Sequence, residues 1–202
     1  MKQLNHPYEY LMQTLRESVL TKESFLKDAG ETLIRASEAL ANGIRQGGKV
    51  LIFGNGGSAA DAQHMAAEMV GKLFIDRRPL PVLALTTDSS ILTAIGNDYG
   101  YEQVFLRQVQ ALAKSGDIVL AISTSGNSKN VLLALQAAKT MGCFTIGLTG
   151  GSGGKLKEIC DLCLCAAHGA NSSRIQETHI FAIHSIVDIL DRFYLKGFED
   201  LK

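Results

Sequence analysis

Two loops rich in glycine and hydroxyl residues are the first candidates for chemistry in this sequence. Residues 54–58 (Gly-Asn-Gly-Gly-Ser) follow the apolar run Val50–Phe53, and residues 123–128 (Ser-Thr-Ser-Gly-Asn-Ser) follow Ile118–Ile122. We expect each loop to open a helix, so that free backbone N–H groups and the positive end of the helix dipole can hold a phosphate. Because no Lys follows either loop in the pattern that binds nucleoside triphosphates, the expected ligand is a phosphorylated small molecule.

A pair of possible metal ligands lies on the helix predicted after the first loop. His64 and Glu68 are four residues apart there, and they therefore face the same way. Such a pair can bind one divalent ion, and it can equally be an ordinary surface pair of small energetic value. Its position two turns after a phosphate-type loop favours the metal.

The last helix, expected from about Ser172 to Tyr194, is mostly apolar but carries Gln176, His179 and His184. At about 100° per residue, Gln176 and His184 are two turns apart and only modestly rotated, whereas His179 lies on the other side of Gln176. From spacing alone either histidine could join a site. The other would be a core histidine with a hydrogen-bond partner.

Polar residues after the second strand are further candidates. Asn97 and Asp98 could touch sugar hydroxyls, and residues 97–100 (Asn-Asp-Tyr-Gly) would equally make a good turn. Asp88 is predicted to cap the helix that starts at Ser89.

These groups need an α/β fold to bring them together. Five apolar runs separated by helical patterns are predicted as strands: Val50–Phe53, Val82–Leu85, Ile118–Ile122, Thr145–Leu148 and Leu162–Ala166. Alternation of strands and helices predicts a parallel sheet covered on both faces, in a single domain of residues 1–202. Ligands of such sheets bind beyond the carboxyl ends of the strands, where both loops lie.

The first 46 residues are predicted to be helical, in two segments whose apolar positions span 8–19 and 29–44. Neither this region nor the apolar last helix finds enough partners within one three-layer domain. We therefore expect a homo-oligomer.

Composition excludes several classes of function. Lys and Arg number 20, as do Asp and Glu, so the formal net charge of zero argues against a general nucleic-acid or membrane-surface role. No signal peptide and no membrane-spanning run is visible, which predicts a soluble, cytoplasmic protein. The four cysteines, Cys143, Cys160, Cys163 and Cys165, are expected to be buried thiols and not metal ligands.

Taken together, these motifs resemble those of the sugar isomerase (SIS) domain family, over nearly the whole chain. The matching pieces are residues 54–58, His64-x-x-x-Glu68, residues 96–98 (Gly-Asn-Asp), residues 123–128, and residues 174–177 (Arg-Ile-Gln-Glu) with His184. No single piece is specific, but the combination is.

The resemblance implies a flavodoxin-like fold with a five-stranded parallel sheet, extra N-terminal helices (1–46) used in oligomer packing, and a homotetramer with active sites shared between subunits. It implies one zinc ion per subunit on His64, Glu68, Gln176 and His184, which selects His184 over His179. Glu68 and His184 are the implied acid–base pair. The implied substrate contacts are Asn55, Gly56, Gly57, Ser58, Glu68, Asn97, Asp98, Ser123, Thr124, Ser125, Ser128 and Gln176.

The branch of the family that this chain resembles isomerises a phosphorylated seven-carbon sugar. The implied reaction converts sedoheptulose 7-phosphate to D-glycero-D-manno-heptose 7-phosphate through an enediol, in bacterial heptose biosynthesis for surface polysaccharide. A related branch associates with the replication initiator and lacks the complete set of four ligands. A third possible function is that of a regulatory domain that senses a sugar phosphate, but such a domain would not need the set of metal ligands. Because this chain retains all four residues, an enzyme is favoured.

Overall fold

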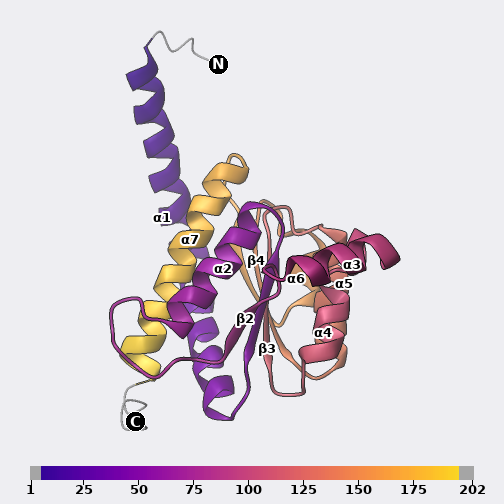
Figure 1. Ribbon diagram of the computed structural model, residues 1–202. Helices are drawn as coiled ribbons and strands as arrows, with labels where there is room; N and C mark the ends of the chain where they lie inside the picture. The colour runs from indigo at the N-terminus through magenta and orange to yellow at the C-terminus, as the bar shows by residue number, and fades with distance from the viewer. Residues whose placement is uncertain (1–5, 196–202) are drawn as a thin grey trace.

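The computed structural model describes residues 6–195, which form a parallel sheet between two layers of helices (Figure 1). The strands are β1 (Val50–Gly54), β2 (Val82–Ala84), β3 (Ile118–Ser123), β4 (Phe144–Gly150) and β5 (Leu162–Ala166). The α-helices are α1 (Pro7–Arg45), α2 (Gly57–Val70), α3 (Ser89–Tyr99), α4 (Leu106–Leu112), α5 (Lys129–Thr140), α6 (Gly154–Ile159) and α7 (Ser172–Ile189). A short 3₁₀-helix, η1 (Tyr101–Gln103), follows α3, and a π-helix, η2 (Leu190–Tyr194), follows α7.

The sheet has five parallel strands in the order β2-β1-β3-β4-β5, as the flavodoxin-like prediction requires. The central strands β1 and β3 are buried along their whole length, because apolar side chains cover both of their faces. Side chains alternate between two cores. In β1, Val50 and Ile52 face one core, while Leu51 and Phe53 face the other.

The two cores correspond to the two helical layers. Figure 1 shows α1, α2 and α7 on one side of the sheet and α4, α5 and α6 on the other. The layer of α1, α2 and α7 contains both helices on which metal ligands are expected. The three-layer architecture predicted from the alternation of elements is therefore confirmed.

The N-terminal region differs from the prediction of two helices, because α1 is one continuous helix of 39 residues. The apolar stripe does not stop between the two expected segments: Thr21 and Phe25 are buried and continue at helical spacing into Ala29 and Leu33. His6 caps the start of the helix by accepting a hydrogen bond from the backbone N–H of Tyr8.

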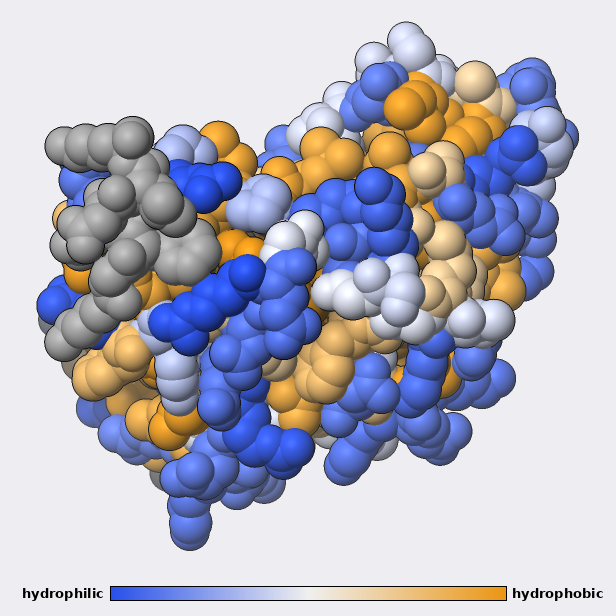
Figure 2. Space-filling view, turned by 90° about the horizontal axis from the view of Figure 1, so that it is seen from below, coloured by the Kyte–Doolittle hydropathy of each residue, from blue (hydrophilic) through white to orange (hydrophobic). Residues whose placement is uncertain are grey.

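The first half of α1 extends beyond the sheet and leaves large apolar side chains in contact with solvent (Figure 1). Leu11, Leu15 and Leu20 are each more than half exposed. On the face shown in Figure 2, hydrophobic residues are interspersed with hydrophilic ones. Among the described residues, no helix combines the length and the apolar character needed to cross a bilayer.

Candidate metal centre and phosphate site

The two glycine- and hydroxyl-rich loops lie side by side at the carboxyl edge of the sheet. Residues 54–58 leave β1 and residues 123–128 leave β3, and these two strands pair directly, with Gly54 opposite Ile122. The chain order of the sheet reverses between these strands, which is where such folds bind their ligands. Both loops therefore lie at the carboxyl ends of their strands, as predicted.

The helices that follow these loops keep their N-termini free of side-chain caps. The described helices α1, α3 and α7 are capped by His6, Asp88 and Asn171, whereas no side chain caps α2 or α5. Helix N-termini leave backbone N–H groups without intrahelical partners. The N–H groups of Ser58 and Ala59 donate to Asn55 O and Gly56 O, and that of Val131 donates to Asn130 Oδ1. The first N–H groups, those of Gly57 in α2 and of Lys129 and Asn130 in α5, have no partner among the described residues and are left for a ligand such as a phosphate.

Hydroxyl groups converge within the second loop. Ser123 Oγ and Ser128 Oγ are 3.1 Å apart, and the backbone N–H of Asn127 donates to Ser125 Oγ at 3.2 Å. Gly126 allows the turn with φ of +65°, a conformation that residues with a side chain rarely adopt. Thr124, between Ser123 and Ser125 in the chain, is half-buried.

The carboxamide of Asn55, in the first loop, is held by two neighbours. Asn130 of α5 donates to Asn55 Oδ1 at 2.8 Å, and Asn55 Nδ2 donates back to Asn130 Oδ1 at 2.9 Å. The hydroxyl of Tyr101 donates to Asn55 Oδ1 at 3.2 Å. Asn130 and Tyr101 were not singled out from the sequence, because neither belongs to a motif, and only folding brings them to the loop.

A compact group of nitrogen and oxygen ligands lies between α2 and α7. His64 Nε2 is 2.9 Å from His184 Nε2 and 3.3 Å from Glu68 Oε1. One ligand atom from each of the three residues lies within 4.8 Å of the others. The side chains of His64 and Glu68 are 43% and 17% exposed, so the group is open to solvent on one side.

This group fits a divalent metal ion of the zinc type. Two imidazole nitrogens and a carboxylate oxygen are ligands that zinc accepts. Glu68 Oε2 is buried and has no hydrogen-bond partner among the described residues. A buried carboxylate oxygen without a partner is costly, and a cation at this point would satisfy it.

Of the two histidines that the spacing could not distinguish, His179 lies in the core. It is fully buried and its Nε2–H donates to the backbone oxygen of Thr149 at 3.0 Å. Burial lowers the pKa of His179 to about 4, so the ring is neutral. His179 is therefore the core histidine, and His184 is the one that faces His64.

Gln176 contacts the first loop. A Cβ added at Gly57 would lie 2.1 Å from Gln176 Nε2, so the carboxamide lies directly over the start of α2. Gln176 contacts Gly57 and His184 contacts His64, seven or eight residues further along each helix. The helices α2 and α7 therefore run parallel. The structure brings ligand atoms of His64, Glu68 and His184 together, while the carboxamide of Gln176, the fourth expected ligand, lies against Gly57.

Asn97 and Asp98 lie in the last turn of α3 and not in a separate turn. Both side chains are exposed, and the carboxamide of Asn97 donates to Asp98 Oδ1 at 2.7 Å. Asp88 caps α3 as predicted, accepting from the N–H of Ile91 at 2.8 Å.

Asp61 is a residue near the site that sequence reasoning missed. It lies one turn before His64 on α2, and burial raises its pKa to about 6, against the opposing charge of His64. Its Oδ2 is buried with no hydrogen-bond partner among the described residues. The sequence does contain one indication of this residue: Asp61 lies three residues before His64, so both are on one face of the helix.

The four cysteines differ in burial. All four are free; Cys143 is buried as expected, but Cys160, Cys163 and Cys165 are only partly buried. Burial raises the pKa of the Cys143 and Cys165 thiols, which makes them less reactive.

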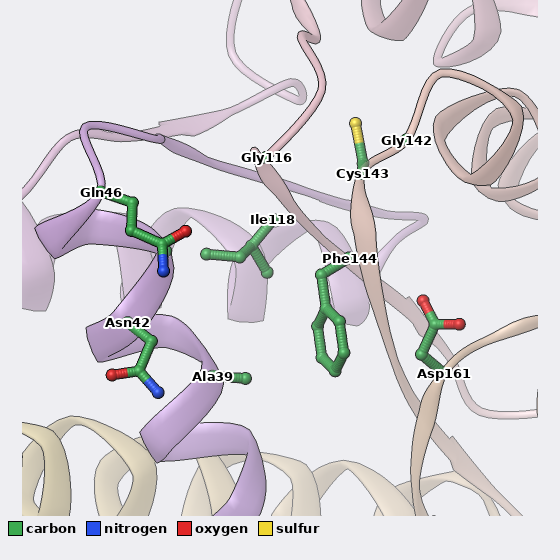
Figure 3. A pocket seen from close by; sticks show the side chains of 10 residues that line it. Ala39, Asn42, Gln46, Gly116, Ile118, Gly142, Cys143, Phe144 and Asp161 are labelled. Atoms are coloured by element: carbon green, nitrogen blue, oxygen red, sulfur yellow. The ribbon is translucent and has the colours of Figure 1, made fainter.

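A cavity of about 530 Å³ lies at the amino ends of the strands, away from both loops (Figure 3). Asn42 of α1 and the C-cap residue Gln46 line it together with Ile118 and Phe144. None of the residues expected to bind metal or substrate lines this cavity.

Comparison with known proteins identifies relatives. The family model described as SIS domain matches residues 15–150. A phosphoheptose isomerase from Aliarcobacter butzleri is 55% identical over 80% of this chain and 85% of its own length. The structure of a phosphoheptose isomerase from Neisseria gonorrhoeae superposes with a TM-score of 0.87 at 44% identity, covering 92% of this chain and 99% of that one. The corresponding enzyme from Francisella tularensis gives 0.88 at 36% identity, covering 93% and 99%.

Proposed function

The chain belongs to the SIS domain family and, within it, to the phosphoheptose isomerases, and we propose that it converts sedoheptulose 7-phosphate to D-glycero-D-manno-heptose 7-phosphate. The observation that carries this proposal is the convergence of His64, Glu68 and His184, two of them on a helix that starts at one of two loops suited to a phosphate. Isomerisation of a sugar phosphate needs both parts, an anchor for the phosphate and acid–base groups at the carbonyl.

The loops after β1 and β3 would hold the substrate. Their uncapped helix N-termini and the hydroxyls of the second loop supply donors for phosphate oxygens. Side chains and backbone groups of both loops and of α3 would contact the sugar and its phosphate. The proposed contacts are Asn55, Gly56, Gly57, Ser58, Glu68, Asn97, Asp98, Ser123, Thr124, Ser125, Ser128 and Gln176.

One zinc ion per subunit would be held by His64, Glu68 and His184, with Gln176 as the fourth ligand. The donor set of nitrogen and oxygen atoms and the unpartnered Glu68 Oε2 support the first three ligands, and the resemblance to the family motif supports Gln176. When bound, the ion would polarise the substrate carbonyl and stabilise negative charge on the oxygen.

Glu68 would remove a proton from C1 of the ketose, which converts the C1–C2 unit into an enediol. The proton returns to C2, and the hydroxyl hydrogen on O1 is lost as the new C1 carbonyl forms. His184, 2.9 Å from His64 across the helix interface, would exchange protons with the two oxygens. The substrate is oxidised at C1 and reduced at C2, so no outside electron donor or acceptor is needed.

Assembly and location complete the proposal. The exposed leucines in the first half of α1 support packing of residues 1–46 between subunits, in a cytoplasmic homotetramer whose active sites lie at subunit interfaces. Nothing in the described residues favours the alternative, a non-catalytic partner of the replication initiator, because the acid–base and metal residues are all retained.

An assay of the purified protein with sedoheptulose 7-phosphate, followed by NMR of the sugar phosphates, tests this function. We expect an equilibrium mixture of ketose and aldose, loss of turnover with a strong chelator, and recovery on addition of zinc. A protein that holds zinc but leaves the ketose unchanged would overturn the proposal.

A further inference from the structure

The guanidinium of Arg77 caps the end of the helix that carries Glu68. Its Nη2 donates to the backbone oxygen of Glu68 at 3.0 Å, and its Nη1 donates to Met69 O at 2.8 Å and to Gly71 O at 3.3 Å. The last turn of α2 contains no basic residue of its own. Arg77, from the segment between α2 and β2, therefore satisfies carbonyls that the helix leaves without partners.

The same guanidinium also binds the element that follows α7. Arg77 Nε donates to Asp191 Oδ1 at 2.6 Å, and the two side chains are only 3% and 1% exposed. Asp191 belongs to the π-helix η2, seven residues after His184. One buried ion pair thus joins the C-terminal ends of the two helices that carry the metal ligands.

This pair completes a set of three contacts along the parallel helices α2 and α7. The carboxamide of Gln176 lies over Gly57 at their start, His64 faces His184 further on, and Arg77 with Asp191 joins their ends. One contact lies before the pair of imidazoles and one lies after it. Together they fix how far α2 is shifted along its axis relative to α7. Metal ligation tolerates errors of only about 0.2 Å in ligand distance, so this offset matters for the centre.

We propose that Arg77 and Asp191 are positioning residues for the metal centre, holding Glu68 and His64 at the correct offset from His184. The proposal rests on the proposed function, which supplies the ligand set. A buried ion pair adds little net stability, because desolvation of both charges offsets their attraction. The planar fork of an arginine does, however, restrict the groups that it binds to one relative placement.

A direct role in binding the substrate phosphate does not fit Arg77. Its side chain is almost fully buried, and its donors are directed at backbone carbonyls and at Asp191. The adjacent Arg78 is exposed and provides a matched comparison at the next position of the chain.

The test uses the double variant Arg77→Met/Asp191→Leu, which removes both charges together and leaves no unpaired charge in the interior. Thermal unfolding, zinc affinity by competition with a chromophoric chelator, and the visible spectrum of the Co²⁺-substituted protein are measured for it, for Arg78→Met and for the wild type. We expect a folded double variant with a changed Co²⁺ spectrum, zinc affinity lower by about ten- to a hundredfold, and a lower kcat at similar KM. Arg78→Met should match the wild type in each measurement.

A folded double variant with the wild-type zinc affinity and Co²⁺ spectrum would overturn the proposal. If the double variant fails to fold, Arg77→Lys provides the test, because lysine keeps the positive charge but lacks the planar guanidinium. A wild-type Co²⁺ spectrum in Arg77→Lys would contradict the proposed positioning role of Arg77. A wild-type protein without zinc and without isomerase activity would overturn the proposed function as well. An active, zinc-loaded wild type with unaffected variants would overturn only the role of the pair.

Discussion

His64 and His184 face each other with their Nε2 atoms 2.9 Å apart, although 120 positions separate them in the chain. The ring centroids are 5.0 Å apart and the ring planes are inclined by 61°. Two protonated imidazoles would repel each other at this distance, so the contact requires a neutral ring or a shared cation. The centre is thus made by the packing of two helices and not by a local motif.

Replacing the proposed base tests the catalytic assignment. We expect Glu68→Gln to lower kcat by more than about a hundredfold, because the amide cannot accept the C1 proton. Steady-state turnover of sedoheptulose 7-phosphate is the measurement. Glu31→Gln, on the exposed side of α1, should keep wild-type turnover, and near-normal turnover in Glu68→Gln would contradict the role of Glu68.

Removing one imidazole tests the metal centre. His64→Ala should be purified with little bound zinc, since it loses a ligand nitrogen within 4.8 Å of the other two groups. Elemental analysis after dialysis gives the stoichiometry. His168→Ala removes an exposed histidine paired with Asp28 and should retain one zinc per subunit; equal zinc content in both variants would argue against this centre.

Adding one methyl group at the first loop tests the contact between Gly57 and Gln176. In Gly57→Ala the new Cβ would lie 2.1 Å from Gln176 Nε2, so the carboxamide must move. We expect a higher KM and weaker zinc binding, measured by kinetics and chelator competition.

The control for this variant is Gly30→Ala in α1, where the new Cβ would lie at an ordinary 3.5 Å from Leu26. It should leave KM unchanged and stabilise the helix by about 0.5–1 kcal/mol, because alanine loses less backbone entropy on folding. An unchanged KM and zinc affinity in Gly57→Ala would show that the position of Gln176 does not matter.

Because His179 is buried and neutral, we expect the stability of the protein to depend on pH. The pKa of His179 is about 4 in the folded protein, against 6.5 for a free side chain. Between these values the unfolded chain binds a proton that the folded chain does not, so stability is lost as pH falls below 6.5. His179 alone should contribute a loss of about 2 kcal/mol to the free energy of unfolding between pH 7 and pH 5, measured with urea as the difference between the wild type and a variant without this imidazole.

His179→Gln isolates this effect, because its amide can still donate to Thr149 O and does not titrate. The variant should show a smaller loss of stability over the same pH range. Identical pH dependence in the two proteins would mean that His179 does not stay neutral in the folded state.

The sheet could be predicted because each of its strands is a short apolar run, and runs such as Ile118–Ile122 are buried on both faces. The continuity of α1 was missed because Thr21 is polar, yet it is buried within the apolar stripe. The choice between His179 and His184 could not be made from spacing, since both lie on a helix with several buried faces. Their surroundings, Thr149 in one case and His64 in the other, come from distant segments.

Arg77 and Asp191 could not be found from the sequence at all. In sequence, Arg77 lies in a polar segment before Pro79, and Asp191 lies in the polar end of a helix, where charged residues are normally solvated. Their burial depends on the meeting of two helix ends, which no local pattern encodes.

The order of the proposed metal ligands along the chain has a consequence for biosynthesis. His64 and Glu68 are made well before His184, which follows His64 by 120 positions and reaches them only when α7 docks on α2. A nascent chain can therefore offer zinc no more than half a centre. Ligation of an ion by all three groups would therefore follow synthesis and docking of α7, and until then the subunit would keep its fold through its apolar core.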